Sequence, residues 1–221
     1  MKMSGKKGIA IGAALLLAFV LWTVLVTAVD VQPAGEYEPQ QNVGFATVNT
    51  QFHKLTGFSG TFYRLTEWLG AVPIAVCGCF GVFGLVQLVR RKSLAKVDRD
   101  ILLLGGYYIL VIAVYFLFEK LALNYRPVLT EGKAAPEASY PSTHTMLALC
   151  VMPTLIFQLR RRMKDTPVRK ILIWTAALVT ALLVIGRIAA GVHWLTDIIG
   201  SVIFSAGLYL LYRSAVTIGE K

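Results

Sequence analysis

Charged residues are scarce in this chain. Only 15% of its 221 residues are Asp, Glu, Lys or Arg, whereas 56% are hydrophobic. Soluble domains carry about 25% charged residues, so the composition argues against an ordinary water-soluble globule. Disorder is excluded as well, because disordered chains are poor in aliphatic and aromatic residues and this chain is rich in both.

Cysteine and histidine are also rare. The three cysteines are Cys77, Cys79 and Cys150, and the three histidines are His53, His144 and His193. The cysteines have neither the spacing of a metal site nor the even number of a disulfide framework. We expect them to be small buried hydrophobic residues. Any chemistry that uses histidine has few residues to draw on.

Long apolar stretches are what the chain has in abundance. Six can be distinguished, at residues 8–29, 70–89, 101–118, 143–159, 171–186 and 194–212. A helix needs about 20 residues to cross the hydrocarbon core of a bilayer. The sequence therefore predicts an all-α, polytopic membrane protein in which six transmembrane helices form a bundle, with residues 1–221 as a single membrane domain.

An alternative interpretation of the first apolar stretch is a secretory signal peptide. It follows three lysines, as a signal peptide would, but its run over residues 8–29 exceeds the roughly 7 to 15 residues of a signal core. The sequence Thr27-Ala28-Val29-Asp30 also makes a poor cleavage site. We expect the segment to be retained as a helix.

Basic residues outnumber acidic ones, 22 to 12, and their placement indicates topology. Sixteen lie at one set of helix ends: Lys2, Lys6, Lys7, Arg90, Arg91, Lys92, Lys96, Arg99, Arg160, Arg161, Arg162, Lys164, Arg169, Lys170, Arg213 and Lys221. The positive-inside rule then predicts that both termini are cytoplasmic. The loops at 30–69, 119–142 and 187–193 face outward, and nucleic-acid binding, which a basic chain could indicate, loses most of its support.

The first outer loop contains an amphipathic stretch. Its apolar residues recur at helical spacing: Phe52, Leu55, Phe58, Phe62, Leu65 and Leu69. Such a stretch beside a membrane usually lies in the interface, and anchoring is the favoured interpretation. A lid or lateral gate that guides a lipid headgroup is the alternative. We expect His53, in the same loop, to be an ordinary surface histidine.

Three segments of the outer face carry residues suited to chemistry. They are Lys120 and Arg126; Ser142, Thr143 and His144; and Arg187, His193 and Asp197. The second segment opens an apolar stretch at its outward end, and a helix N-terminus of this kind favours anions. All three segments are predicted to lie on the same membrane face.

His193 and Asp197 are spaced i, i+4, which places both side chains on one helical face. A carboxylate in that position holds an imidazole in one tautomer and leaves the far nitrogen as nucleophile or base. Guanidinium groups match phosphate oxygens, and two histidines suit phosphoryl transfer, one attacking phosphorus and one protonating the leaving oxygen. The sequence lacks an Asp or Glu cluster for a metal pair, so we expect cations to stabilise the charge and no cofactor to take part.

These segments resemble the signature of the type 2 phosphatidic acid phosphatase (PAP2) superfamily of membrane lipid phosphatases. That signature is Lys, six residues and Arg-Pro; then Pro-Ser-Gly-His; then Ser-Arg, five residues, His, three residues and Asp. The matching residues here are Arg126 and Pro127; Pro141, Ser142 and His144; and Arg187, His193 and Asp197. The motifs lie within residues 119–197, and the six-helix layout extends the resemblance over nearly the whole chain.

The chain departs from the signature at three positions. Gly186 stands for the serine of the third motif, and Thr143 stands for the glycine of the second. Glu119 occupies the position of the lysine in the first motif, and Lys120 follows one residue later. Lys133 is a possible substitute for that lysine.

The resemblance implies a role for each site residue. His193 would be the nucleophile that forms a phosphohistidine, Asp197 would orient it, and His144 would protonate the leaving group. The phosphate-binding residues would be Lys120, Arg126, Ser142, Thr143 and Arg187.

The sequence thus predicts a metal-independent lipid phosphate phosphatase with an outward-facing active site. Undecaprenyl diphosphate is the foremost specific substrate, because its recycling needs such a site. Phosphatidylglycerol phosphate and phosphatidic acid are the alternatives. A non-catalytic lipid-headgroup receptor or a transporter is the alternative from another class. Transport normally leaves internal repeats in the sequence, and we find none.

Overall fold

The computed structural model describes residues 5–130 and 132–218, and the predicted inner residues Lys2 and Lys221 lie outside them. The helices are α1 (Gly5–Ala28), α2 (Ala46–Thr56), α3 (Gly60–Leu69), α4 (Ala71–Arg91), α5 (Arg99–Leu121), α6 (Thr143–Arg162), α7 (Pro167–Ala190) and α8 (Leu195–Ile218), with a 3₁₀ turn at Leu94–Lys96. Strands β1 (Gln32–Ala34) and β2 (Gln41–Val43) form a small antiparallel hairpin.

Helices suited to a membrane make up most of the fold. Among the described residues, five helical segments are long and apolar enough to cross a bilayer: Gly5–Ala28, Gly60–Arg91, Arg99–Leu121, Pro167–Ala190 and Leu195–Ile218. Helix α6 has 20 residues but is less apolar than these. The fourth expected stretch, residues 143–159, continues as a helix to Arg162. The fifth, residues 171–186, lies within a longer helix, Pro167–Ala190. All six apolar stretches are therefore helical, and five of them meet the length and hydropathy of a span.

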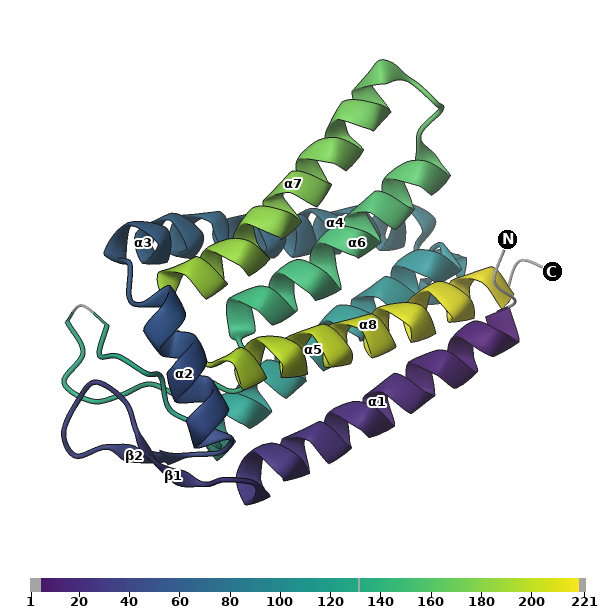
Figure 1. Cartoon of the computed structure of the whole chain (residues 1–221). Helices are drawn as coiled ribbons and strands as arrows, with labels where there is room; N and C mark the ends of the chain where they lie inside the picture. Colours follow the sequence, from purple (N-terminus) through teal and green to yellow (C-terminus); the bar gives the residue numbers. More distant parts are fainter. Residues whose placement is uncertain (1–4, 131, 219–221) are drawn as a thin grey trace.

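Helices α1 and α8 run side by side along the bundle (Figure 1). Small residues permit their close approach: a Cβ on Gly12 would stand 2.9 Å from the carbonyl oxygen of Gly207. Close backbone packing through small residues is the usual basis of helix association in membranes. Helix α8 is the most buried of the candidate spans and also packs against α5, α6 and α7.

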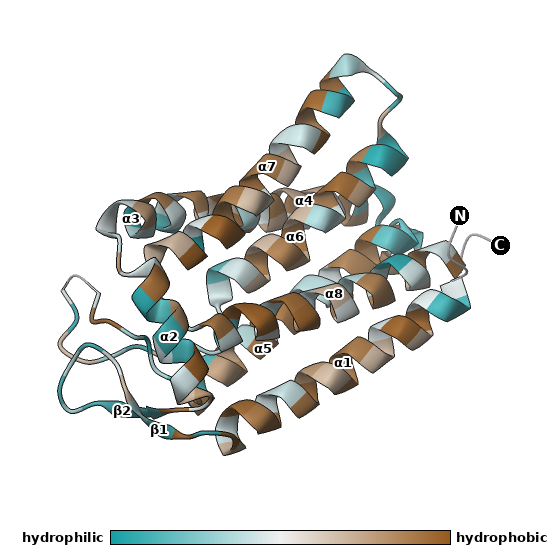
Figure 2. Ribbon diagram, in the orientation of Figure 1, coloured by the Kyte–Doolittle hydropathy of each residue, from teal (hydrophilic) through white to brown (hydrophobic). Residues whose placement is uncertain are grey.

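The two ends of the bundle differ. One end, the loop end, holds the β1–β2 hairpin, α2, α3 and residues 122–130 and 132–142, whereas the start of α1 and the end of α8 meet at the other end, the termini end (Figure 1). The hydrophobic colouring in Figure 2 follows the middle of the long helices, and hydrophilic residues gather at both ends. Many side chains on these helices are both apolar and exposed, such as Trp174, which is 75% exposed. Exposed apolar surface on this scale fits contact with lipid rather than with water.

Helices α2 and α3 form where the amphipathic stretch was expected. Leu55, Phe62 and Leu65 are exposed on them, while Asn49 and Thr66 are buried. Buried polar side chains on one face and exposed apolar side chains on the other are expected of a helix that lies against lipid. This arrangement fits both the anchor and the gate interpretations.

Two expectations about single residues are wrong. His53 is 6% exposed: its Nε2 lies 3.2 Å from Glu36 Oε1, and its ring meets that of Trp194 edge to face at 5.7 Å. The loop in which it lies folds back onto the bundle, and a sequence pattern does not reveal this. Cys150 is buried as expected, but Cys79 is exposed on α4, because that face of the helix is apolar without being covered by protein.

The termini end is held by an ion-pair network between α4, α5 and α6. Arg162 Nη2 donates to both carboxylate oxygens of Asp100 at 2.8 Å, and its Nη1 donates to Asp98 Oδ2 at 3.0 Å. Arg91 Nη1 reaches the other oxygen of Asp98 at 2.8 Å. The hydrogen bond from Arg91, joined by those of Arg162 and Gln87, lowers the pKa of Asp98 to about 2.

Candidate active site

His193 lies in the short turn between α7 and α8, at the loop end. Gly191 begins this turn with φ of +64°, and a Cβ there would stand 1.6 Å from the carbonyl oxygen of Gly57. Both the left-handed backbone and the lack of space require glycine at this position. Ser59 N donates to Ala190 O at 3.1 Å in the same region. The junction of α2 and α3 therefore closes over the turn that carries His193.

The His193 ring is held on one side only. Its Nδ1 lies 3.1 Å from the carbonyl oxygen of Ser139 and 3.5 Å from Asp197 Oδ2. Both neighbours are acceptors, so Nδ1 carries the hydrogen and Nε2 keeps its lone pair. Nε2 is buried and has no hydrogen-bond partner among the described residues. The predicted pair with Asp197 is present, and the carbonyl of Ser139 is the closer of the two groups.

Asp197 is fully buried in the first turn of α8. Its Oδ2 accepts a hydrogen bond from Trp194 N at 2.9 Å, and the side chains of Ser139 and Asn124 lie beside the carboxylate. The hydrogen bond from Trp194 N holds the carboxylate oxygen that faces the imidazole. Sequence reasoning missed Ser139 and Asn124, although both stand within two residues of a matched motif.

Arg187 lies in the last turn of α7 and is buried, with 0% of its side chain exposed. Its Nη1 donates to Thr66 Oγ1 at 3.1 Å and to Glu67 Oε1 at 2.9 Å, and its guanidinium lies over the ring of Tyr63, 5.5 Å from the centroid. Its Nε and Nη2 are buried without a hydrogen-bond partner in the described structure. A buried cation with donors to spare is suited to bind an anion.

The structure explains why Gly186 stands where the signature has serine. A Cβ at this position would stand 2.6 Å from Thr66 Cγ2. The glycine thus lets α3 pack closely on α7, and the Thr66 hydroxyl in turn holds Arg187. A serine here would require α3 to move.

His144 lies in the first turn of α6, and its Nε2 is 3.6 Å from Glu67 Oε1. A Cβ on Gly70 would stand 2.6 Å from His144 Cδ2, so glycine at the α3–α4 junction makes room for the ring. Ser142, the N-cap residue of the helix, is buried: its hydroxyl donates to Thr145 Oγ1, and its backbone N–H donates to the Asp197 carbonyl at 3.3 Å. Thr143 is the first residue of the helix and is half-buried.

Arg126 is held by the loop that follows α5. Its backbone N–H donates to Glu137 O at 2.9 Å, and its Nη1 lies 3.3 Å from Glu137 Oε2. Lys133 Nζ lies 3.0 Å from the other oxygen of Glu137. Burial of Glu137 acts in the opposite direction, but Arg126 and Lys133 hold the pKa of its carboxyl below the usual range. The Nε of Arg126 is buried without a partner among the described residues.

The positive groups act on the same imidazole. Burial, together with the charges of Arg187 and Arg126, lowers the pKa of His193 well below its usual range. His144 also contributes to this effect. Residues from three separate segments therefore meet at one site, and His193 is neutral within it.

Lys120 is the exception among the predicted residues. It is exposed in the last turn of α5, and no contact between it and the other site residues is seen in the described structure. Lys133, the possible substitute, shares Glu137 with Arg126 and so lies nearer to the site.

Sequence reasoning did not identify Glu67, Thr66 or Gly70 as parts of the site. All three come from the amphipathic stretch, which was interpreted as an anchor or a gate. A useful signal is the pair Thr66-Glu67, which interrupts the apolar face of that stretch. In the parts of the chain that are described, no three His, Cys, Asp or Glu side chains gather as a metal site requires. Metal independence stays a prediction.

Comparisons with known proteins bear on the family and the fold of this chain. Residues 100–218 match the model of the PAP2 superfamily. Phosphatidylglycerophosphatase B of Bacillus subtilis (strain 168) is 34% identical over 155 residues, which are 70% of this chain and 60% of that protein.

The fold also matches a solved structure, that of a transmembrane PAP2-type phosphatidylglycerolphosphate phosphatase from Bacillus subtilis. The TM-score is 0.62 with 18% identity, over 95% of this chain and 96% of the other. Together with the five apolar helices, this likeness indicates an integral membrane protein. Its helical fold, its site and the match over residues 100–218 lead to one conclusion: the chain belongs to the PAP2 superfamily.

Proposed function

We propose that this protein is a lipid phosphate phosphatase that hydrolyses a phosphate monoester or diphosphate of a membrane lipid. The observation that carries the proposal is the state of His193. Its Nδ1 is held by Ser139 and Asp197, its Nε2 has no hydrogen-bond partner among the described residues, and burial with the charges of Arg187 and Arg126 lowers its pKa. This combination is what a nucleophile that attacks phosphorus requires.

The first step transfers the phosphoryl group to the enzyme. His193 Nε2 attacks phosphorus, the bond from phosphorus to the lipid oxygen breaks, and His144 gives its proton to that oxygen. Arg187 and Arg126 stabilise the charge that spreads over the phosphoryl oxygens. Ser142 and Thr143, at the N-terminus of α6, contribute to the phosphate cradle.

The second step releases phosphate. Water attacks the phosphorus of the phosphohistidine, the nitrogen–phosphorus bond breaks, and His144 takes a proton from the water. Phosphate leaves, and His193 returns to its neutral form. Asp197 orients the imidazole and stabilises its positive charge during both steps.

The lysine of the first motif is assigned to Lys120 in this proposal, with Lys133 as its competitor. Lys120 needs a change of rotamer or backbone to reach the phosphate from its exposed position, whereas Lys133 already lies beside Glu137 and Arg126. Lys120→Gln and Lys133→Gln, compared for the KM of the same substrate, decide between the two. The lysine that binds phosphate is the one whose loss raises KM.

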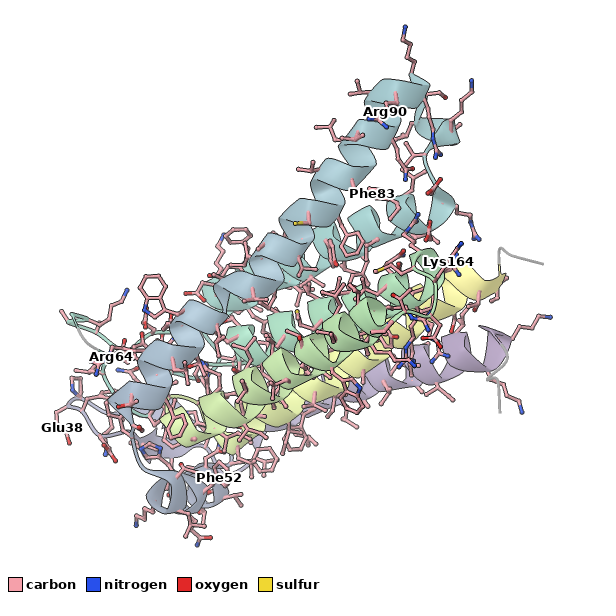
Figure 3. All side chains as sticks on the ribbon, turned by 90° about the horizontal axis from the view of Figure 1, so that it is seen from above. Glu38, Phe52, Arg64, Phe83, Arg90 and Lys164 are labelled. Atoms are coloured by element: carbon pink, nitrogen blue, oxygen red, sulfur yellow. The ribbon has the colours of Figure 1, made fainter. Side chains whose placement is uncertain are left out.

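The proposed topology has six membrane helices, with α6 as the sixth because it lies among the five apolar ones (Figure 1). Both termini are cytoplasmic, and the loop end with the site faces outward. Labelling of single cysteines in intact cells with a membrane-impermeant reagent tests this arrangement. A cysteine at Glu38, at the loop end (Figure 3), should react, and one at Lys164 should not.

Phosphatidylglycerol phosphate is the first substrate to test, because the relative that is 34% identical is named for it. Undecaprenyl diphosphate and phosphatidic acid belong in the same panel. Purified protein in detergent should release phosphate, and His193→Ala should lower turnover by about 10⁴-fold, by comparison with members of catalytic triads. EDTA should leave the rate unchanged, and strong inhibition would instead indicate a metal mechanism. Binding of lipid phosphate without any release of phosphate would favour the receptor or transporter.

A further inference from the structure

Glu67 connects the two groups on which the proposed chemistry depends. Its Oε1 lies 2.9 Å from Arg187 Nη1 and 3.6 Å from His144 Nε2. Arg187 is wholly buried, whereas the Glu67 side chain is 39% exposed. A partly exposed carboxylate therefore lies against a cation that is itself fully shielded from solvent.

A phosphate group would need the same place. In the proposed mechanism Arg187 binds a phosphoryl oxygen and His144 Nε2 faces the leaving oxygen. Carboxylate and phosphate oxygens are both charged acceptors and make the same hydrogen bonds to a guanidinium. One location between Arg187 and His144 cannot hold both anions.

We propose that Glu67 is a resident anion of the empty site, which the phosphate of the substrate displaces and which returns to expel the phosphate product. The inference rests on the proposed function and extends it with a residue that sets the affinity for phosphate.

Energetics favour a resident anion. A buried guanidinium without a partner is strongly destabilising, and Glu67 neutralises Arg187 while no substrate is bound. The Thr66 hydroxyl accepts a second hydrogen bond from Nη1, so Arg187 stays in position when Glu67 leaves. The buried Nε and Nη2 of Arg187 lack partners in the described structure. They can donate to phosphate, whereas they do not donate to Glu67.

Glu137 provides the contrast. It also pairs with a cation of the site, Arg126, but Lys133 and the Thr130 hydroxyl hold it as well. Glu137 is thus fixed in its loop, whereas the contacts seen for the Glu67 carboxylate among the described residues are with the two groups that the substrate needs. In the described part of the chain, the further charged or titratable groups that act on or with His144 are Arg126 and His193, and neither is an anion.

The experiment measures binding of inorganic phosphate to the purified full chain in detergent, from the rise in melting temperature with phosphate concentration. Glu67→Gln keeps the shape of the side chain and removes its charge. The Kd of phosphate should fall by about tenfold in this variant, since a charge-assisted contact no longer competes. Glu67→Ala should change the Kd in the same direction, and it replaces Glu67→Gln as the test if the glutamine variant does not fold.

Glu38→Gln is the matched control, because Glu38 lies exposed at the same end of the bundle (Figure 3) and loses the same charge. Its Kd should equal that of the wild type. A Kd in Glu67→Gln that equals or exceeds the wild-type value overturns the inference, as does a lack of phosphate binding by every variant. Because no turnover is needed, a protein that binds phosphate in this pattern but cleaves no lipid phosphate would contradict the proposed function alone.

Discussion

The indole nitrogen of Trp194 donates a hydrogen bond of 2.6 Å to the carbonyl oxygen of Tyr125. Trp194 directly follows His193, and Tyr125 directly precedes Arg126. This bond therefore joins the turn that carries the proposed nucleophile to the loop that carries a proposed phosphate-binding cation. Trp194 is almost fully buried, so water cannot replace the bond.

Trp194→Phe should lower kcat/KM by about tenfold, because loss of one buried hydrogen bond leaves the Tyr125 carbonyl unpaired and lets Arg126 move. Steady-state kinetics with a lipid phosphate measure the effect, which we expect mainly in KM. Trp174→Phe, at a site on α7 that is 75% exposed, is the control and should behave as the wild type. Normal kinetics in a folded Trp194→Phe would show that this bond does not position Arg126.

His144→Asn should affect substrates according to their leaving group. A lipid alcohol needs a proton to leave, so turnover of a lipid phosphate should fall by about 10²- to 10⁴-fold, the range for general acids. The p-nitrophenolate of p-nitrophenyl phosphate leaves without a proton, and its formation should fall far less. His193→Ala is the comparison, because loss of the nucleophile should slow both substrates equally. An equal loss in His144→Asn would exclude the role of general acid.

The pH dependence of kcat/KM should report the lowered pKa of His193. Attack requires the neutral imidazole, and burial, together with the charges of Arg187 and Arg126, lowers the pKa of His193 below the usual histidine value of about 6.5. The acid limb of the wild type should therefore lie below pH 6.5 or so. Arg126→Gln removes one of the charges that lower this pKa, so its acid limb should move to higher pH.

Protonation of the substrate phosphate affects the wild type and Arg126→Gln equally, so it does not alter the difference between their acid limbs. A shift of the acid limb to lower pH in Arg126→Gln, or no shift at all, would contradict the assignment of that limb to His193. The absolute rate of the variant will also fall, and only the position of the limb is diagnostic.

The sequence was sufficient to predict the long helices and the closeness of several candidate site residues, whose roles stay predictions. Apolar length predicts every long helix, since crossing a bilayer demands a run of apolar residues that few other structures need. Helical periodicity predicted that His193 and Asp197 face each other; the two side chains do meet, but His193 lies in the turn before α8 rather than on the helix. The position of Arg187 relative to them was also constrained, because only a short turn separates α7 from α8.

Contacts between distant segments were not predictable in this way. The carbonyl of Ser139 is the nearest partner of His193 Nδ1, and backbone carbonyls carry no sequence signal. Glu67 approaches Arg187 only because α3 folds back onto α7, with Gly186 making room for Thr66. His53 became buried for a similar reason, as its loop packs against Trp194.

Arg162→Gln should destabilise the protein without changing its chemistry. Arg162 makes a bidentate pair with Asp100, whose side chain is 10% exposed, and also binds Asp98 at the termini end. Removal of one partner from a buried ion pair leaves an uncompensated charge. Partial exposure of Arg162 and the remaining contact from Arg161 reduce the effect to about 2 kcal/mol.

Thermal unfolding in detergent measures the stability of this variant, with kcat per folded molecule measured in parallel. Lys164→Gln is the matched control, because Lys164 is an exposed basic residue just beyond the end of α6 (Figure 3). Arg162→Gln should unfold at a lower temperature than this control, and both should keep the wild-type kcat, since the network and the active site lie at opposite ends of the bundle. A fall in kcat confined to Arg162→Gln would show that the two ends are coupled through α5 and α6.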